Sequence, residues 1–451
     1  MHIHFIAIGG SVMHQLAIAL SLKGYTITGS DDEIFEPAAT NLKNAGIFPE
    51  MDGWHPEKIN GNIDAVILGM HAKQDNPELQ KAMEAGVKIF SFPEYIYQES
   101  KNKKRVAVGG SHGKTTTTAM IMHVLKFANE DFDYLVGARL QGFEQSVKVT
   151  NAGLIICEAD EYPASAIEKR PKFHFLFPHI AVITGIAWDH INVFPTFDFY
   201  LEQFIIFINK IEKGGVLIYN ETDDILRSLV LQNQRDDIKY IPYSLPTYFI
   251  ENGVTSVMIE NEKTDLKVFG NHNLLNIMAA YYVCKELNVT ARTFAKGIAS
   301  FSGAAKRLEL LDESENGNIY RDFAHAPSKV LASVDAMKQQ FPNRKLVAVL
   351  ELHTFSSLNE NFMNEYNGAL ENADEAIVFY SKHALELKRL PLLNPEKVKA
   401  GFGKKNLEVI TSREELEKRL VNTPKTNANF LFMSSGNYEG MNILQVIKSR
   451  H

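Results

Sequence analysis

The sequence predicts an α/β protein made of successive parallel sheets. Short apolar runs typical of buried strands alternate with segments of helical periodicity along the chain, and this alternation is typical of parallel sheets. The 451 residues, divided by roughly 150 residues per domain, suggest three domains. The composition, with 45% hydrophobic and 22% charged residues, lies near the globular average. We therefore expect three α/β domains, and not a disordered chain or a coiled coil.

The first domain is expected at residues 1–98. An apolar run ends in Gly9 and Gly10, and apolar residues at helical spacing follow until Gly24, which predicts a strand, a glycine turn and a helix. The other strands predicted for this domain are residues 26–28, 65–68 and 87–90. The boundary is placed at the polar segment 99–105, which precedes a new apolar run.

The second and third domains are expected at residues 99–300 and 301–451. A small, polar, glycine-containing connection at 301–307 separates them. The strands predicted for the second domain are residues 106–108, 154–157, 180–184 and 216–219. The strands predicted for the third domain are residues 319–323, 345–350, 376–379 and 429–433. Helical segments lie between them, so both domains are expected to hold a parallel sheet.

Charge and cysteine content exclude several classes of protein. Lys and Arg number 47 against 54 Asp and Glu, a net charge of −7, which argues against a nucleic-acid-binding surface. The two cysteines, Cys157 and Cys284, are too few for a disulfide framework and fit a reducing compartment, so we expect a cytoplasmic protein. The N-terminus lacks the basic start of a signal peptide, and no apolar stretch reaches the ~20 residues of a membrane helix. We expect no nucleic-acid partner and no membrane.

The strongest local motif is the glycine-rich loop GGSHGKTTTT at residues 109–118, between a predicted strand and a predicted helix. In such loops backbone N–H groups bind phosphate oxygens, a lysine such as Lys114 neutralises their charge, and a hydroxyl such as that of Thr115 can bind Mg²⁺. The spacing G-x-x-G-K-T is shorter than the usual one, so a glycine turn that only caps a helix is the alternative. We expect a phosphate site.

Acidic residues follow the next predicted strand. The run at 154–157 leads directly into Glu158 and the acids at 160 and 161, and the strand at 180–184 leads to Asp189 and His190. Ligands of open α/β sheets bind at the carboxyl edge of the strands, so Glu158 is our first candidate for a magnesium ligand. The alternatives are a solvated acidic loop for Glu158 and a helix start for the Asp-His pair.

The turn at Gly9 and Gly10 partly matches the dinucleotide-binding fingerprint, of which only the second glycine is in place. Asp31 and Asp32 follow the second predicted strand, about 20 residues further on, where an acid could accept a hydrogen bond from a ribose or base. A purely structural turn is the alternative.

The segment GNHNLLN at residues 270–276 begins a predicted helix. Asn273 and Asn276 lie three residues apart and therefore share a helix face. Paired amides can satisfy both the donor and the acceptor edge of adenine, whereas helix capping is the alternative role of such residues.

Six motifs occur in one order along the chain: GSHGKTTTT, EADEY, WDH, GNHNLLN, KRLEL and DFAHAP. Together they resemble the Mur ligases of peptidoglycan synthesis, over nearly the whole chain. The resemblance implies a Rossmann-like N-terminal domain for a UDP-sugar, a central P-loop ATPase domain and a Rossmann-like C-terminal domain for the incoming amine. It also implies an ATP-dependent ligase that makes an amide bond through an acyl phosphate. We expect the protein to be a monomer or a weak homodimer.

The resemblance implies a role for particular residues. The catalytic residues would be Lys114, Glu158, His190 and Arg307. The Mg²⁺ ligands would be Thr115, Glu158 and His190. The ATP contacts would be Gly110, Ser111, His112, Gly113, Lys114, Thr115, Thr116, Asn273, Asn276, Arg307, Asp322 and His325. The UDP-sugar contacts would be Gly9, Gly10, Ser11, Ser30, Asp31, His71 and His112.

Two branches of the family compete for the acceptor, and both take UDP-N-acetylmuramate. The segment EADEYPASAIEKRPKF resembles the branch that adds the recycled tripeptide L-alanyl-γ-D-glutamyl-meso-diaminopimelate, which is our first expectation. The segment ELHTFSSLNENF is nearer to the branch that adds L-alanine, which is the alternative. The alanine at 326 departs from the family's DFAHHP pattern and leaves a third alternative, a nucleotide-binding regulatory protein without catalysis.

Overall fold

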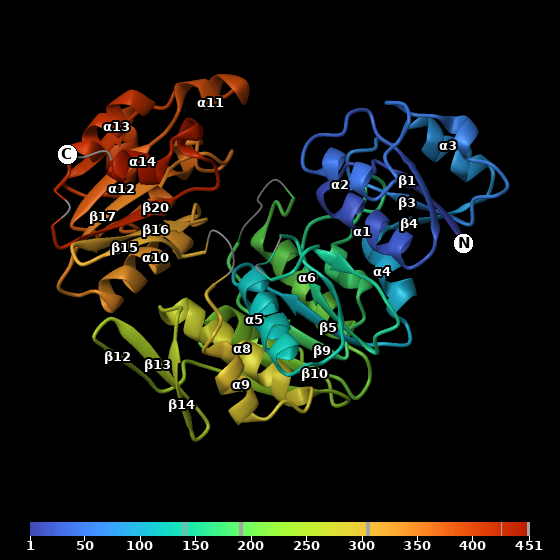
Figure 1. The fold of residues 1–451 in the computed structure, drawn as a ribbon, viewed down its shortest axis with the longest axis horizontal. Coiled ribbons are helices and arrows are strands. Elements are labelled where there is room, and N and C mark those ends of the chain that lie inside the picture. The colour runs from blue at the N-terminus through green and yellow to red at the C-terminus, as the bar shows by residue number, and fades with distance from the viewer. Residues whose placement is uncertain (139, 141, 189–192, 304–306, 425, 449–451) are drawn as a thin grey trace. The chain divides into compact units, whose positions relative to one another are not determined.

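The computed structural model of the chain describes residues 1–138, 140, 142–188, 193–303, 307–424 and 426–448. The chain forms two compact units, Met1–Leu245 with Leu275–Ile298, and Pro246–Leu274 with Ala299–His451. Figure 1 follows the elements of each unit along the chain.

The first unit begins with a four-stranded parallel sheet, in the order β2-β1-β3-β4. These strands are β1 (His2–Ile6), β2 (Thr26–Ser30), β3 (Ala65–Leu68) and β4 (Lys88–Ser91). The accompanying helices are α1 (Ser11–Leu22), α2 (Ala38–Asn44), η1 (Pro56–Lys58), α3 (Pro77–Glu84) and α4 (Phe92–Ser100). All four strands were predicted from the sequence, and β3 has the predicted bounds.

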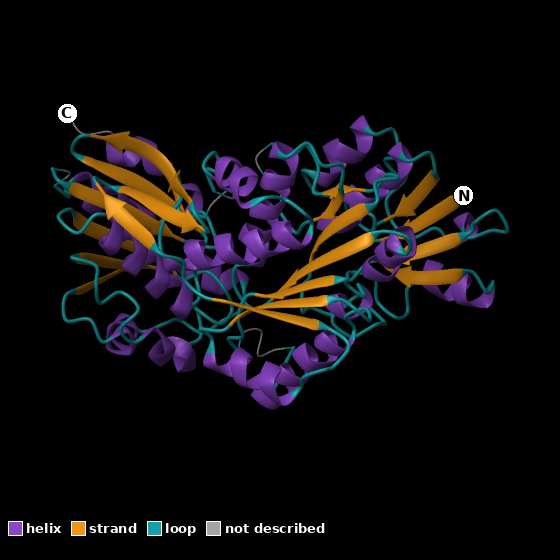
Figure 2. Cartoon of the chain, turned by 90° about the horizontal axis from the view of Figure 1, so that it is seen from below, coloured by secondary structure: helices purple, strands orange, loops and turns teal. Residues whose placement is uncertain are grey.

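The same unit continues with a seven-stranded sheet in the order β11-β10-β9-β5-β8-β6-β7, parallel except for the pair β6 and β7. Its strands are β5 (Lys104–Gly109), β6 (Asp133–Leu135), β7 (Val147–Lys148), β8 (Leu154–Glu158), β9 (Ile180–Ile183), β10 (Val216–Asn220) and β11 (Lys239–Tyr243). Its helices are α5 (Lys114–Phe127), η2 (Lys172–Phe175), α6 (Phe197–Asn209), α7 (Asp224–Gln232), α9 (Ala291–Ile298) and, from Leu275 onward, α8 (Asn271–Glu286). Helices lie on both sides of this sheet (Figure 2).

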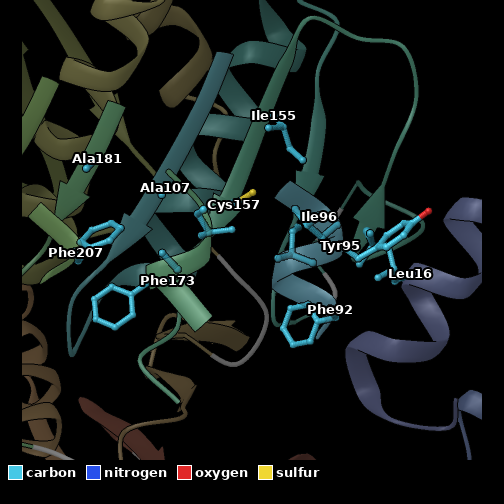
Figure 3. Close-up of a cluster of buried hydrophobic side chains, with 14 of the residues drawn as sticks. Leu16, Phe92, Tyr95, Ile96, Ala107, Ile155, Cys157, Phe173, Ala181 and Phe207 are labelled. Carbon is cyan, nitrogen blue, oxygen red and sulfur yellow. The ribbon is translucent and has the colours of Figure 1, made fainter. Parts of the chain in front are cut away.

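One cluster of buried side chains joins the two sheets of the first unit. Ala107, Cys157 and Ala181 lie on the central strands, and Phe173 and Phe207 pack against them, with 4.8 Å between the two phenyl centroids. Residues of α1 and α4, such as Leu16 and Phe92, belong to the same cluster (Figure 3). The cluster therefore fixes the strand ends that carry the phosphate loop and the acidic segment. The segment 99–105, placed at the first boundary, forms the end of α4 and the start of β5.

The second unit contains a six-stranded sheet in the order β15-β16-β20-β17-β18-β19. Only its edge pair β15 and β16 is antiparallel. Its strands are β15 (Glu309–Ser314), β16 (Gly317–Asp322), β17 (Lys345–Glu351), β18 (Glu375–Phe379), β19 (Leu407–Ile410) and β20 (Ala428–Met433). Its helices are α10 (Pro327–Gln340), η3 (Glu360–Tyr366), α11 (Lys382–Leu387), α12 (Pro395–Phe402), α13 (Arg413–Val421), η4 (Tyr438–Gly440) and α14 (Ile443–Lys448).

The second unit also contains an antiparallel sheet that the sequence reasoning missed. Its strands are β12 (Tyr248–Glu251), β13 (Val254–Ile259) and β14 (Glu262–Leu266). The segments YFIE, VTSVMI and EKTDL do not alternate between apolar and polar residues, so the sequence gives little period-2 signal. The predicted α/β class with parallel sheets is nevertheless confirmed. Among the described residues, no helix is both long and apolar enough to cross a membrane.

Candidate active site

The phosphate loop connects β5 to α5 and depends on two glycines in the left-handed region. Gly110 has φ +121°, and a Cβ there would lie 2.8 Å from the backbone nitrogen of Thr184. Gly113 has φ +82°, and a Cβ there would overlap the side-chain oxygen of Asn276. Positive φ and close approach both favour glycine. The sequence GGSHGKT thus folds as a tight turn whose backbone leads into the N-terminus of α5, as anion-binding loops do.

The segment after β9 fixes the phosphate loop from one side. The backbone N–H of Ser111 donates to the carbonyl of Gly185 (2.9 Å), and its hydroxyl lies 2.8 Å from the hydroxyl of Tyr200. The backbone N–H of Ala187 also donates to the Ser111 hydroxyl (2.8 Å). Ser111 is buried and its hydroxyl supports the loop, and Thr116 is buried in α5. The predicted contacts of both residues with ATP stay predictions.

Lys114 is paired with a carboxylate that the sequence reasoning left without a role. Its Nζ donates to Glu161 Oε2 (2.8 Å) and to the carbonyl of Gly110 (2.7 Å), and Glu161 is 1% exposed. Burial works against the charge of Lys114, but Glu161, Asp160 and Glu158 outweigh it and raise the pKa of the ammonium. Lys114 therefore stays charged at the mouth of the loop.

Thr115 and Glu158 meet at the position expected for a metal. The Thr115 hydroxyl donates to Glu158 Oε1 (2.7 Å), and the backbone N–H of Gly137 donates to Glu158 Oε2 (2.9 Å). A hydroxyl and a carboxylate are the hard oxygen ligands that Mg²⁺ takes together with phosphate oxygens and water. The third predicted ligand, His190, lies outside the described residues. Within the described part of the chain, no group of three His, Cys, Asp or Glu side chains could hold a metal.

Of the two asparagines predicted to contact adenine, Asn276 lies at the phosphate loop. The hydroxyl of Thr117 donates to Asn276 Oδ1 (3.1 Å), beside Gly113. Asn273 instead donates through Nδ2 to the carbonyl of Phe269 (2.9 Å). The two amides thus differ in their partners although they share a helix.

A pocket of about 70 Å³ opens beside Glu158 in the first unit. Asp160 and Lys172, which line it, form an ion pair with 2.7 Å between Oδ2 and Nζ. Burial works against the charge of Asp160, but Lys172 and Lys114 outweigh it and hold the pKa of that carboxyl below its usual range. Asp160 belongs to the EADEY motif and Lys172 to the KRPKF segment, but the sequence did not show that the two side chains meet.

The N-terminal glycine turn is closed by an aspartate. Gly9 N–H donates to Asp31 Oδ2 (2.7 Å), and Ala7 precedes the turn at φ 68°. Burial and the neighbouring Asp32 raise the pKa of Asp31 to about 6. Asp31 therefore has a structural task in this turn, and its predicted contact with the UDP-sugar stays a prediction.

The other residues predicted for the UDP-sugar lie in the same domain. Gly10 is the N-cap of α1 and Ser11 its first residue. Ser30, at the end of β2, is buried, and the ammonium of Lys58 lies 3.3 Å from its hydroxyl. His71 is exposed. Their binding roles stay predictions.

In the second unit the structure brings three predicted ATP residues together. Asp322 Oδ1 accepts from the backbone N–H groups of Leu308 (3.2 Å) and Phe323 (2.8 Å). The guanidinium of Arg307 lies over the Phe323 ring, 4.7 Å from its centroid, and His325 Nδ1 donates to the Phe323 carbonyl (2.9 Å). Residues 304–306, which precede Arg307, lie outside the described part.

These features define a class of protein: an α/β enzyme whose phosphate loop lies at the seven-stranded sheet of its first unit. Three family models match in succession: "Mur ligase family, catalytic domain" over residues 2–104, "Mur ligase middle domain" over 108–284 and "Mur ligase, glutamate ligase domain" over 306–436. The chain belongs to the Mur ligase family, whose members are ATP-dependent amide ligases of peptidoglycan synthesis. The resemblance and the three-domain architecture are confirmed, whereas the boundaries at 99 and 301 stay predictions.

Curated relatives agree with this assignment. The chain is 33% identical over 388 residues to UDP-N-acetylmuramate–L-alanine ligase of Clostridium botulinum (strain Hall), a match that covers 84% of this chain and 82% of that protein. It is 30% identical over 455 residues to the protein of the same name from Clostridium tetani, covering 96% and 95%.

Solved structures of both branches share the fold. A murein peptide ligase from Psychrobacter arcticus has a TM-score of 0.64 at 22% identity, covering 99% of this chain and 98% of that one. The UDP-N-acetylmuramate-alanine ligase of Thermotoga maritima has a TM-score of 0.69 at 23% identity, covering 98% and 97%. At these identities the likeness describes the fold alone.

Proposed function

We propose that this chain joins the lactyl carboxylate of UDP-N-acetylmuramate to the amine of L-alanyl-γ-D-glutamyl-meso-diaminopimelate and converts ATP to ADP and phosphate. The observation that carries the proposal is the segment from 158 to 173, whose sequence resembles the tripeptide-adding branch. It folds back on itself, because Lys172 N–H donates to the Tyr162 carbonyl (2.9 Å) and Ala164 N–H donates to the Arg170 carbonyl (3.0 Å). One of its acids, Glu161, meets the phosphate loop, and another, Asp160, lines the adjoining pocket.

The reaction needs an activated carboxylate. The loop amides and Lys114 would bind the phosphates of ATP, and the donor carboxylate would attack the terminal phosphorus to give an acyl phosphate and ADP. Mg²⁺, held by Thr115 and Glu158, would supply positive charge for the phosphate oxygens. The acceptor amine then displaces phosphate through a tetrahedral intermediate.

The carboxyl edge of the six-stranded sheet supports an acceptor site in the second unit. The chain leaves β17 toward β18 and β19 and returns with β20 on the other side of β17, and ligands of open parallel sheets bind at such switch points. Glu351, which ends β17, accepts from the Ser434 hydroxyl and from the backbone N–H of Tyr438 (2.9 Å). Gly436 packs against Glu351 and His353 so closely that a Cβ would lie 2.8 Å from both side chains.

L-alanine is the second candidate acceptor, and the names of the curated relatives favour it. Both acceptors present the amine of an L-alanyl group, so they share the reacting atom and differ in whether further residues are attached to the alanyl carbonyl. The proposed tripeptide specificity therefore depends on contacts beyond the first residue of the acceptor. A monomer or weak homodimer in the cytoplasm stays the prediction of the sequence.

Phosphate release with UDP-N-acetylmuramate tests these alternatives. The acceptors compared are L-alanine, L-alanyl-D-glutamate and the tripeptide, at equal concentrations. We expect the highest kcat/KM with the tripeptide. A higher kcat/KM with L-alanine would replace the first candidate by the second, and no phosphate release with any acceptor would favour the regulatory alternative.

A further inference from the structure

The pocket beside Glu158 has apolar walls and few charged groups. Val12 of α1, Phe92 of α4 and Leu135 of β6 form part of the wall, and the charged lining groups are Glu158, Asp160 and Lys172. Glu158 also accepts a hydrogen bond from Thr115 of the phosphate loop. A group bound in this pocket is therefore next to the site proposed for phosphoryl transfer.

Lys172 is held in a defined position in this pocket. Its backbone begins η2, and the following Phe173 is 1% exposed in the core. Its ammonium donates to Asp160 Oδ2 (2.7 Å) and lies 5.6 Å from the ring centroid of Phe92 and 5.9 Å from that of Tyr162. Backbone and side chain are thus both constrained.

The constrained ammonium can take a second anionic partner. The Lys172 side chain is 20% exposed, and an ammonium has three N–H donors, of which the ion pair with Asp160 uses one. A cation near aromatic rings and aliphatic walls interacts with an anion more strongly than it would in water. Of the three charged groups that line the pocket, Lys172 is the one that is positive.

We propose that Lys172 binds the carboxylate of the donor substrate and is the residue that selects a sugar nucleotide bearing a carboxylate. This inference rests on the proposed function, because it takes UDP-N-acetylmuramate as the donor. A carboxylate bound in this pocket lies near Glu158 and Asp160, whose negative charges work against it. Lys172 offsets that repulsion and orients the carboxylate. It is a specificity-determining residue of the donor site.

Isothermal titration of the full chain with two sugar nucleotides tests the inference. UDP-N-acetylmuramate carries the lactyl carboxylate, and UDP-N-acetylglucosamine lacks it. The unmodified chain is expected to bind the muramyl nucleotide more tightly. Lys172→Met should weaken that binding by about 10- to 100-fold, the range for a hydrogen bond to a charged group, and should change the affinity for UDP-N-acetylglucosamine by less than about 2-fold.

Two further variants separate charge from packing. Lys172→Arg keeps the charge and should restore most of the preference for the muramyl nucleotide. Lys148→Met removes a lysine that is paired with Asp131 (3.1 Å) and does not line the pocket, and it should change neither affinity.

The ratio of the two affinities decides the outcome. Because both ligands are measured on the same variant, a general loss of folded protein lowers the binding stoichiometry of both alike, whereas an equal loss of affinity for both would overturn the assignment. A preference that persists in Lys172→Met would overturn it as well. If the unmodified chain bound neither nucleotide, the donor substrate of the proposed function would be wrong. If the unmodified chain bound UDP-N-acetylmuramate and Lys172→Met left the ratio of the two affinities unchanged, only the role of Lys172 would be wrong.

Discussion

Glu161 Oε2 lies 2.8 Å from Nζ of Lys114, so the lysine of the phosphate loop has a buried carboxylate as its partner. The two residues are 47 positions apart, on different segments that meet at the carboxyl edge of the central sheet. The pair keeps the ammonium over the carbonyl of Gly110. Glu161 thus positions the cation that would neutralise the phosphates of ATP.

Removing either member of this pair should reduce turnover, to different extents. Lys114→Ala should lower kcat for ADP formation by about 100-fold or more, the cost typical of a lost group that stabilises transition-state charge. Glu161→Gln keeps the shape but removes the charge that orients Lys114, and should lower kcat by about 10-fold. Lys126→Ala, which removes an exposed contact with the Gly142 carbonyl, serves as control. Equal rates in all three variants would contradict the role of the pair.

Thr115 and Glu158 should determine the requirement for Mg²⁺. Phosphate release, measured against Mg²⁺ concentration, is expected to stop when the metal is chelated. Glu158→Gln should raise the Mg²⁺ concentration for half-maximal rate by about 10-fold, because it loses a charged oxygen ligand. Thr115→Ser retains the hydroxyl and should respond like the unmodified chain. A metal dependence that Glu158→Gln does not alter would place the metal elsewhere.

The phosphate loop should not tolerate a side chain at Gly113. Gly113→Ala combines a positive φ with overlap against Asn276, so we expect ATP binding to weaken by about 100-fold, from about 1 kcal/mol of strain and the displacement of the loop. Gly214→Ala is a matched control, because Gly214 has φ +77° and a Cβ there would meet nothing within 4 Å. ATP binding measured by calorimetry should be unchanged in Gly214→Ala. If both variants bound ATP normally, the close approach of Gly113 to Asn276 would not matter for ATP binding.

The sequence predicted the elements but not the pairs that form the site. Strands β3, β5 and β8 follow from apolar runs, and the phosphate loop follows from its glycines and lysine. The meeting of Glu161 with Lys114 depends on parallel strands β5 and β8 lying side by side, which fixes contacts between residues far apart in sequence. The hydroxyl contact of Ser111 with Tyr200 has the same origin.

Asp31 should make the stability of the protein depend on pH. Its pKa is raised from 3.8 to about 6, by burial and by Asp32, so the folded chain holds a proton there that the unfolded chain releases near pH 4. The contribution of protonated Asp31 is fully present below about pH 4 and is lost as the pH rises through 6. The unfolding free energy relative to Asp31→Asn should therefore fall between pH 4 and 7, by at most about 3 kcal/mol before solvent screening. Urea unfolding of both proteins at each pH measures the difference. In the background of Asp32→Asn, the fall in unfolding free energy should move to lower pH, because a like charge beside Asp31 is gone. If the unfolding free energies of the unmodified chain and of Asp31→Asn ran parallel at all pH values, the raised pKa of Asp31 would be contradicted.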